Sequence, residues 1–203
     1  MKKTEPKPVI RKRDAAELGK ALRFAAEKHG RQARKGTRIP YVSHLLHVAG
    51  FVFEHGGSVD QAIAAVLHDV VEDCDDVTDT ILRQRFGREV AALVKSCTDT
   101  FDGDSRDHKR PWMERKVRYL EHLAKAPRAA VLVSACDKRH NLGALVDDVC
   151  REGRPYLNRF NSSAADQVWF YSRFASIVEG KVPPRLAHEL HELAKAFAEL
   201  AGP

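Results

Sequence analysis

The chain has 203 residues, of which 43% are hydrophobic and 31% are charged. This length and balance are typical of one globular domain and exclude a disordered chain. No stretch approaches the roughly 20 unbroken apolar residues that a membrane span needs, which excludes a membrane protein. The net charge of +6 favours a polyanionic partner, such as nucleic acid, a nucleotide or a phosphate ester. The start lacks the apolar segment of a signal peptide, so we expect a cytoplasmic protein.

Helical periodicity predicts a chain of helices separated by glycine and proline. We expect residues 1–12 to form a flexible basic arm and residues 13–203 to form a single domain. The first helix is predicted to start after Asp14 and to stop at Gly30, and the second is predicted to start at Ser43. Ser58 should begin a third helix, with Gln61 completing a capping box.

Further helices are expected over shorter ranges along the rest of the chain: 81–86, 89–97, 112–125, 127–151, 163–178 and 185–200. A polar segment, residues 98–110, has no periodicity and is expected to be a loop. No convincing alternation of a strand is present. The predicted fold is therefore an all-α bundle of about eight helices.

Two basic clusters stand out, at residues 31–38 and 106–118. The first holds four basic residues in eight and contains no acid. A solvated surface is the simpler interpretation of either cluster, and a binding surface for an anion is the alternative.

The third helix carries polar residues where a buried segment is expected. Residues 62–67 are uniformly apolar and run directly into His68, Asp69, Glu72 and Asp73. In a helix, His68 and Glu72 lie on one side, as do Asp69 and Asp73. Three carboxylates on a core helix are costly unless a cation compensates them, and imidazole with carboxylate is a normal ligand set for Mn, Fe or Zn. The alternative is a polar helix end that faces solvent.

Two distant segments add matching side chains. His44 stands at the start of the preceding helix, and Asp137 ends the strongly apolar run 131–136. A buried aspartate needs a partner. Together with His68 and Asp69, these residues form a plausible set of four metal ligands.

The pattern of His44, then His68-Asp69, then Asp137 resembles that of the HD-domain metal-dependent phosphohydrolases. The flanking motifs resemble the hydrolase domain of the RelA/SpoT family more narrowly, over roughly residues 20–180. These motifs are Arg34-Lys35-Gly36, Pro40-Tyr41-x-x-His44, His68-Asp69-x-x-Glu72-Asp73, Phe86-Gly87 and Asp137-Lys138-x-x-Asn141. The resemblance implies a stand-alone small alarmone hydrolase that removes the 3′-pyrophosphate from ppGpp and pppGpp, giving GDP or GTP.

The resemblance also implies roles for individual residues. One Mn²⁺ would be held by His44, His68, Asp69 and Asp137. Glu72 and Asp73 match the catalytic pair that orients or deprotonates the attacking water. Arg34 and Lys35 match a basic pair along the nucleotide, and Asn141 matches an asparagine beside its sugar.

Three departures from the family pattern concern the nucleotide rather than the metal site. Leu45 follows His44 where the family usually has proline. The loop over residues 35–40 is slightly longer than in the long enzymes. Arg139-His140 stands where apolar or aromatic residues are usual.

Several alternatives remain open at this stage. His47 could replace His44 as a ligand. Other histidines, among them His29, His55 and His140, are expected on the surface. A late polar–aromatic group could pack between helices or close over the base or sugar: Arg159, Asn161, Gln167, Trp169 and Tyr171.

Two other functions compete with the alarmone hydrolase. One is an HD phosphohydrolase for a related nucleotide such as ppApp, and the other is a non-catalytic binder of nucleotide or nucleic acid. The converging ligand set and the Glu72-Asp73 pair speak against the binder, because binding alone does not need them. The expected partner is a small-molecule nucleotide, with no membrane and no nucleic acid. The sequence favours no particular oligomeric state.

Overall fold

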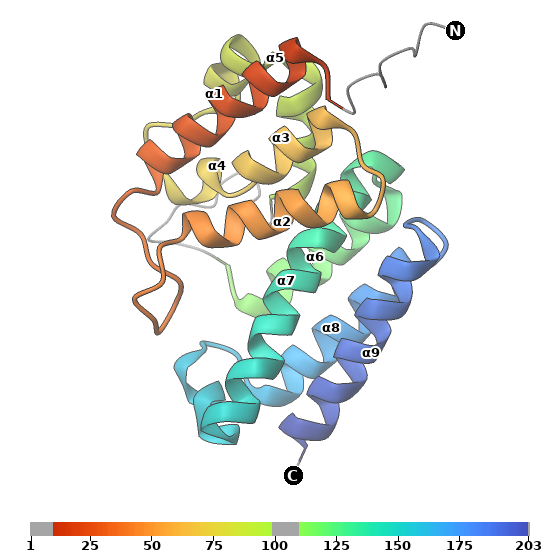
Figure 1. Ribbon diagram of the computed structural model, residues 1–203. Coiled ribbons are helices and arrows are strands. Elements are labelled where there is room, and N and C mark those ends of the chain that lie inside the picture. Colours follow the sequence, from red (N-terminus) through yellow and green to blue (C-terminus); the bar gives the residue numbers. More distant parts are fainter. Residues whose placement is uncertain (1–9, 99–109, 203) are drawn as a thin grey trace, which may run out of the picture.

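The computed structural model describes residues 10–98 and 110–202, and these form a bundle of helices (Figure 1). The helices are α1 (Lys12–Lys28), α2 (Val42–Glu54), α3 (Val59–Leu67), α4 (Val70–Asp73), α5 (Asp79–Cys97), α6 (Trp112–Lys125), α7 (Arg128–Glu152), the 3₁₀ helix η1 (Arg154–Arg159), α8 (Ala164–Val178) and α9 (Pro184–Ala201). Within these residues the only β-type pairing is an isolated bridge between Ala33 and Pro40. The predicted all-α fold is confirmed.

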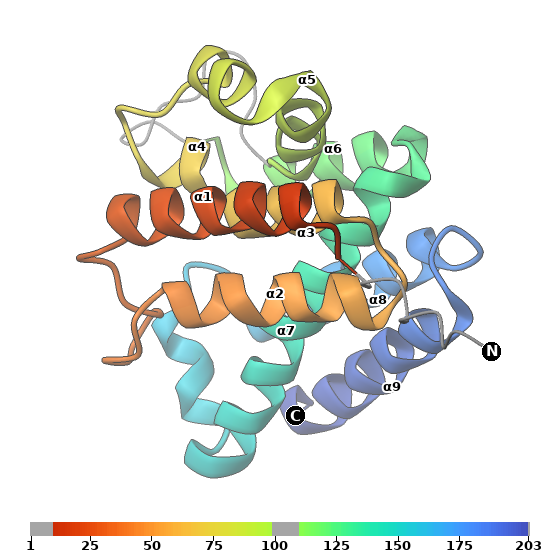
Figure 2. The same cartoon turned by 45° about the horizontal axis from the view of Figure 1, so that its top comes forward.

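Helix α3 is the innermost element, because it contacts α1, α2, α5 and α7 (Figures 1 and 2). This enclosure explains why every residue of the run 62–67 is apolar and buried. The polar residues that follow α3 therefore start from the centre of the molecule.

Helix α7 is the longest element and connects the two parts of the core. Its first half packs with α2, α3 and α5 in the main core, and its second half packs with η1 and α9 in a smaller one. Residues in the middle of α7 consequently lie where the two clusters meet.

Most helix boundaries agree with the predictions, and two helix starts do not. The Ser58–Gln61 capping box is present. Asp14 does not cap α1, which begins at Lys12, because the Arg11 guanidinium binds the Asp14 carboxylate with Nε 2.6 Å from Oδ2. Ser43 lies inside the first turn of α2, which begins one residue earlier.

Two short helices predicted over residues 81–97 form one kinked helix, α5. Gly87 separates the two pieces with φ 88° and ψ 167°, a conformation that favours glycine. The short helix η1 was not predicted, because its residues have no apolar period. Residues 1–9 of the predicted arm and 99–109 of the predicted loop lie outside the described residues. None of the described helices is long and apolar enough to cross a membrane.

Replacing Gly57 with alanine is expected to lower the free energy of unfolding by about 1–3 kcal/mol. A Cβ atom there would lie 2.8 Å from the carbonyl oxygen of Val52 and 3.2 Å from Cδ2 of Leu132. That carbonyl also accepts a hydrogen bond from Gly57 N at 2.7 Å, so the backbone has little freedom to move away. Urea denaturation measures the effect.

The matched control is Gly50→Ala in α2, where an added Cβ meets no atom within 4 Å. Alanine is a better helix former than glycine, so this variant should be as stable as the wild type or more stable by up to about 1 kcal/mol. A wild-type midpoint for Gly57→Ala would contradict the described packing.

Candidate metal centre

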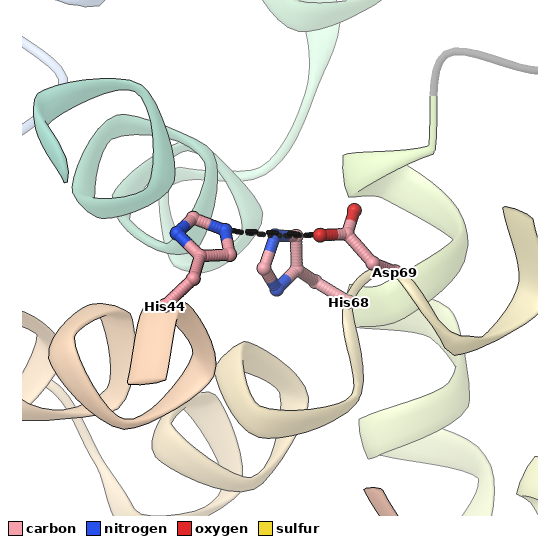
Figure 3. A group of neighbouring side chains, drawn as sticks. All are labelled: His44, His68 and Asp69. Carbon is pink, nitrogen blue, oxygen red and sulfur yellow. Dashed lines mark hydrogen bonds and ion pairs between the residues drawn. The ribbon is translucent and has the colours of Figure 1, made fainter. Parts of the chain in front are cut away.

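Four side chains from three separate segments converge at the centre of the molecule. His44 comes from the first turn of α2, His68 and Asp69 form the junction between α3 and α4, and Asp137 comes from the middle of α7. His44 Nε2 lies 3.3 Å from His68 Nε2, and His68 Nε2 lies 2.9 Å from Asp69 Oδ2 (Figure 3). The predicted metal ligands are thus brought together by the fold.

Asp137 completes the group from the opposite helix. Its Oδ1 lies 3.2 Å from His44 Nε2 and 3.5 Å from His68 Nε2. His44, His68 and Asp137 are each at most 5% exposed, whereas the Asp69 side chain is 21% exposed. The donor atoms of His44, His68 and Asp69 therefore all lie within 4.8 Å of one another, and Asp137 Oδ1 lies beside the two imidazole nitrogens.

The sequence pattern predicted one unbroken helix through the site. The structure has a turn there instead. Helix α3 ends at Leu67, and α4 starts at Val70 after a turn at His68 and Asp69. The φ of Asp69 is −99° and its ψ is −5°. The predicted unbroken helix through His68 and Glu72 is therefore divided into α3 and α4 at this turn. The turn directs adjacent residues His68 and Asp69 to the same point.

The donor set fits a divalent cation. His68 Nδ1 lies 2.8 Å from the carbonyl oxygen of Ala65, and since a carbonyl only accepts, this nitrogen carries the ring proton. Nε2, which faces the Asp69 carboxylate, then carries a second proton unless a metal ion takes that place. Acceptors that face one another repel unless a proton or a metal ion lies among them. Nitrogen and oxygen donors of this kind are suited to Mn, Fe or Zn.

The charges at the site also favour a cation. Burial opposes the protonated form of His68, but the carboxylates of Asp69 and Asp137 hold its pKa well above the usual value. Burial likewise opposes ionisation of Asp137, but Lys138 and His68 hold the pKa of this carboxyl well below its usual value. The carboxylates therefore stay ionised despite their burial.

Both oxygens of Asp137 are held by neighbours on α7. Lys138 Nζ donates to Oδ2, and Asn141 Nδ2 donates to Oδ1 with 2.6 Å between the atoms. Asn141 Oδ1 in turn accepts a hydrogen bond from Arg34 Nη1 at 3.0 Å. Two of the predicted nucleotide-binding residues, Arg34 and Asn141, are therefore bonded to each other and connected to a metal ligand.

The first basic cluster, residues 31–38, lies in an ordered turn. Arg34 N donates to the carbonyl oxygen of Ile39 at 2.8 Å, and Tyr41 N donates to that of Gln32 at 2.9 Å. The Tyr41 hydroxyl donates to Asp69 Oδ2, and Gln32 Nε2 donates to Asp73 Oδ2 at 2.8 Å. The loop is therefore bonded to the metal centre and to the predicted catalytic pair.

A cavity of about 870 Å³ opens beside the metal centre. Arg34, Lys35 and Asn141 line it, together with His44 and Lys138. The predicted catalytic residues are placed differently: half-buried Glu72 and Asp73 lie on α4 and are not among the described residues of the cavity wall.

His140 is a site residue that the sequence analysis missed. It was expected on the surface, but its Nδ1 lies 2.8 Å from His44 Nδ1, and the ring lines the cavity. Burial and the neighbouring His44 lower the pKa of His140 to about 3, so the ring is neutral. The sequence could have predicted this position, because His140 follows Asp137 by three residues on a predicted helix and such residues share a face.

Two other histidines were also wrongly expected on the surface. His29 is 3% exposed, with Nδ1 2.6 Å from Gln32 Oε1, so it supports the glutamine that binds Asp73. His55 is 7% exposed and lies beside Glu189 on α9. His47, the alternative ligand, points elsewhere: its Nδ1 lies 2.8 Å from the carbonyl oxygen of Ser43, and the side chain borders the cavity.

The residues of the late polar–aromatic group lie in different places in the structure. Gln167 and Tyr171 line the cavity, whereas Trp169 packs against the main core. Arg159 binds Glu152, with Nη2 2.6 Å from Oε2, and Asn161 is exposed.

Comparison with known proteins places this geometry in a family. The model of the HD domain family matches residues 21–158. The chain is 40% identical to guanosine-3′,5′-bis(diphosphate) 3′-pyrophosphohydrolase MESH1 of Xenopus tropicalis over 132 residues, which are 64% of this chain and 69% of that protein. It is 38% identical to guanosine-3′,5′-bis(diphosphate) 3′-pyrophosphohydrolase of Aquifex aeolicus over 133 residues, 66% of this chain and 17% of that protein.

Solved structures agree with the sequence relatives. The structure of a metazoan ortholog of SpoT that hydrolyses ppGpp superposes with a TM-score of 0.69 at 25% identity, covering 89% of this chain and 94% of that one. A crystal structure from Listeria monocytogenes EGD-e superposes with a TM-score of 0.64 at 26% identity, covering 78% of this chain and 98% of that one.

Proposed function

Since this chain belongs to the HD domain family, in the group of the RelA/SpoT-type 3′-pyrophosphohydrolases, we propose that it hydrolyses the 3′-pyrophosphate of guanosine alarmones. Water attacks the phosphorus atom attached to the 3′ oxygen, the bond between them breaks, and pyrophosphate leaves a nucleotide with a free 3′ hydroxyl. The observation that carries the proposal is the convergence of His44, His68, Asp69 and Asp137 beside a cavity lined by cations.

We assign the metal to Mn²⁺, bound by those four residues. The mixed imidazole and carboxylate donor set supports a borderline divalent ion over calcium or magnesium, which prefer oxygen ligands. When bound, such an ion lowers the pKa of water and neutralises charge on phosphoryl oxygens.

The remaining roles belong to side chains of the chain itself. Glu72 accepts the proton of the attacking water, and Asp73, held by Gln32, positions that helix turn. Arg34 and Lys35 offset the negative charge of the substrate at the cavity, and Asn141 orients the sugar. These assignments extend the family's roles to the residues of this chain that match its motifs.

The proposal also covers the domain organisation of the chain and its binding partner. Residues 13–203 act as a single hydrolase domain, and the partner is a free nucleotide in the cytoplasm. An adenine counterpart such as ppApp is the second candidate substrate, since none of the four metal ligands distinguishes the base.

The direct test incubates purified protein and Mn²⁺ with ppGpp, pppGpp, pGpp and ppApp and resolves the products. Release of pyrophosphate from the guanosine substrates, abolished by a chelator, is expected. Turnover of ppApp alone would reassign the substrate, and turnover of none of the four would contradict the hydrolase function.

Replacement of Arg34 or Lys35 by alanine should mainly raise KM and leave metal content unchanged. Both side chains line the cavity, and the Arg34 guanidinium is connected to Asp137 only through Asn141. Loss of binding shared by ground and transition states raises KM with little change in kcat. Steady-state kinetics and metal analysis on the same preparations check this.

A solvated basic face that serves nucleic acid makes the opposite prediction. The same two variants would then keep their nucleotide kinetics and show weaker, salt-dependent binding to RNA or DNA. Arg38→Ala is the control, because Arg38 is an exposed residue of the same loop and is not among the described residues of the cavity wall. Unaltered KM in both test variants would remove the loop from the site.

A further inference from the structure

Gln167 is a buried polar residue in the cavity wall, and its amide nitrogen forms no hydrogen bond with the residues that the structure describes. It lies in the first turn of α8, directly after the Ser163–Asp166 capping box, and is 5% exposed. Its Nε2 atom is buried and makes no hydrogen bond. Burial of an amide N–H group without an acceptor costs free energy. Because Gln167 lines the cavity, a turn of its side chain would bring this donor to a ligand there and give it an acceptor.

The location distinguishes Gln167 from the other unpaired groups. Other buried side-chain atoms without a hydrogen bond among the described residues, such as His29 Nε2, belong to residues outside the cavity wall. Asn141, the other amide in the wall, uses its side chain to bind Asp137 and Arg34. Among the described residues, Gln167 alone combines an unpaired buried donor with a place in the cavity wall.

Aromatic rings surround Gln167, with Lys116 Nζ 5.1 Å from the centroid of the Phe170 ring. Phe170 and Tyr171 follow it by three and four residues, so the three side chains share one face of α8, and all of them line the cavity. The Phe170 ring packs against that of Trp112, with 6.0 Å between centroids. Flat apolar rings beside a neutral amide are suited to a nucleoside, whose base is flat and carries neutral acceptors.

The phosphate groups of a substrate find charged partners in the same cavity. Arg34, Lys35, Lys116 and Lys138 all line it. A neutral amide adds little to the binding of a phosphate beside four cations, whereas it can discriminate among neutral acceptors.

We propose that Gln167 Nε2 donates a hydrogen bond to a neutral acceptor of the nucleoside, either a base atom or a ribose oxygen, and so sets substrate specificity. This inference rests on the proposed function for the identity of the ligand as a nucleotide. It adds a residue from α8, a helix that contributes no metal ligand, to the recognition of that nucleotide.

The first test is the stability of the protein without nucleotide. Gln167→Met keeps the unbranched shape of glutamine and removes the unpaired amide, so its urea midpoint should equal or exceed that of the wild type. Gln167→Glu keeps the shape and replaces the donor with an acceptor. A merely structural glutamine predicts a lower midpoint for Gln167→Met together with unchanged nucleotide affinity, and that result would overturn the inference.

The second test is binding, with GDP as the probe in calorimetry. Affinity for GDP should fall about 10-fold in Gln167→Met, and the KM for ppGpp should rise by a similar factor with kcat nearly unchanged. Inhibition by free pyrophosphate should keep its wild-type constant. Equal losses for pyrophosphate and GDP would assign the contact to phosphate and overturn the nucleoside assignment.

Comparison of GDP with ADP separates the two sources of the acceptor. If the base accepts the hydrogen bond, the loss of affinity in Gln167→Met differs between the two nucleotides. If the ribose accepts it, the loss is the same for both. Either result supports a nucleoside contact.

The control is Gln84→Met, the same substitution at an exposed residue of α5, which should change neither affinity nor KM. If GDP binding depends on Gln167 but the protein hydrolyses no alarmone, only the hydrolase proposal is contradicted. Turnover of ppGpp with unchanged KM and GDP affinity in both Gln167 variants would overturn this inference alone.

Discussion

Asp69→Ala and His68→Ala should each abolish stable binding of the divalent ion and all chelator-sensitive hydrolysis. The two side chains supply adjacent donors, with His68 Nε2 2.9 Å from Asp69 Oδ2, and both belong to the turn between α3 and α4. Removal of either donor leaves three ligands and unbalances the charge of a buried site. Plasma mass spectrometry measures the metal content of each purified variant.

A thermal scan with and without Mn²⁺ provides a second reading of the same effect. A ligand that binds only the folded state raises Tm by mass action, so Mn²⁺ should stabilise the wild type and leave both variants unchanged. The control is Asp76→Ala, an exposed aspartate seven residues further on, whose partner is Lys28. Wild-type metal content in Asp69→Ala would disprove the ligand assignment.

Glu72→Gln should lower kcat by about 10²-fold or more while substrate still binds. Glutamine keeps the size of the side chain but does not take a proton from water. Glu72 lies on α4, three residues after the ligand Asp69, and is not among the described residues of the cavity wall, so its change should leave KM and metal content close to wild type. Single-turnover kinetics and nucleotide binding separate the two effects.

Glu89→Gln is the matched control, because Glu89 is an exposed glutamate on α5. A turnover of Glu72→Gln within a few-fold of the wild type would show that the family's catalytic pair has been assigned to the wrong residue. Loss of metal from this variant would place Glu72 among the ligands instead.

The convergence of the predicted metal ligands could be predicted because polar side chains follow apolar runs that are expected to be buried. Charged and imidazole side chains directly after the apolar run 62–67, and again at Asp137, need a common partner, and the fold brings them together. The order of helices was predictable for a similar reason, since capping residues such as Ser58 and Ser163 act locally.

The interruption of the helix at His68 and Asp69 was not predictable from the same pattern. Val70 is fully buried, so the apolar period continues across the turn and mimics an unbroken helix. The turn brings the side chains of His68 and Asp69 to His44 on α2 and Asp137 on α7, and these contacts are between distant parts of the sequence. The placement of His55 and His140 was missed because each lies beside a partner from a distant part of the chain, Glu189 for His55 and His44 for His140.

The hydrogen bonds of the basic loop would couple the binding of substrate to the binding of metal. Tyr41 binds the ligand Asp69, and Arg34 reaches the ligand Asp137 through Asn141. A nucleotide that fixes this loop also fixes two ligand carboxylates, and an ion that fixes those carboxylates prepares the loop. Binding free energies are reciprocal, so nucleotide must raise the affinity for the ion by the same factor as the ion raises the affinity for nucleotide. The protein would therefore retain its metal best when alarmone is abundant and release it most readily once the nucleotide has been consumed.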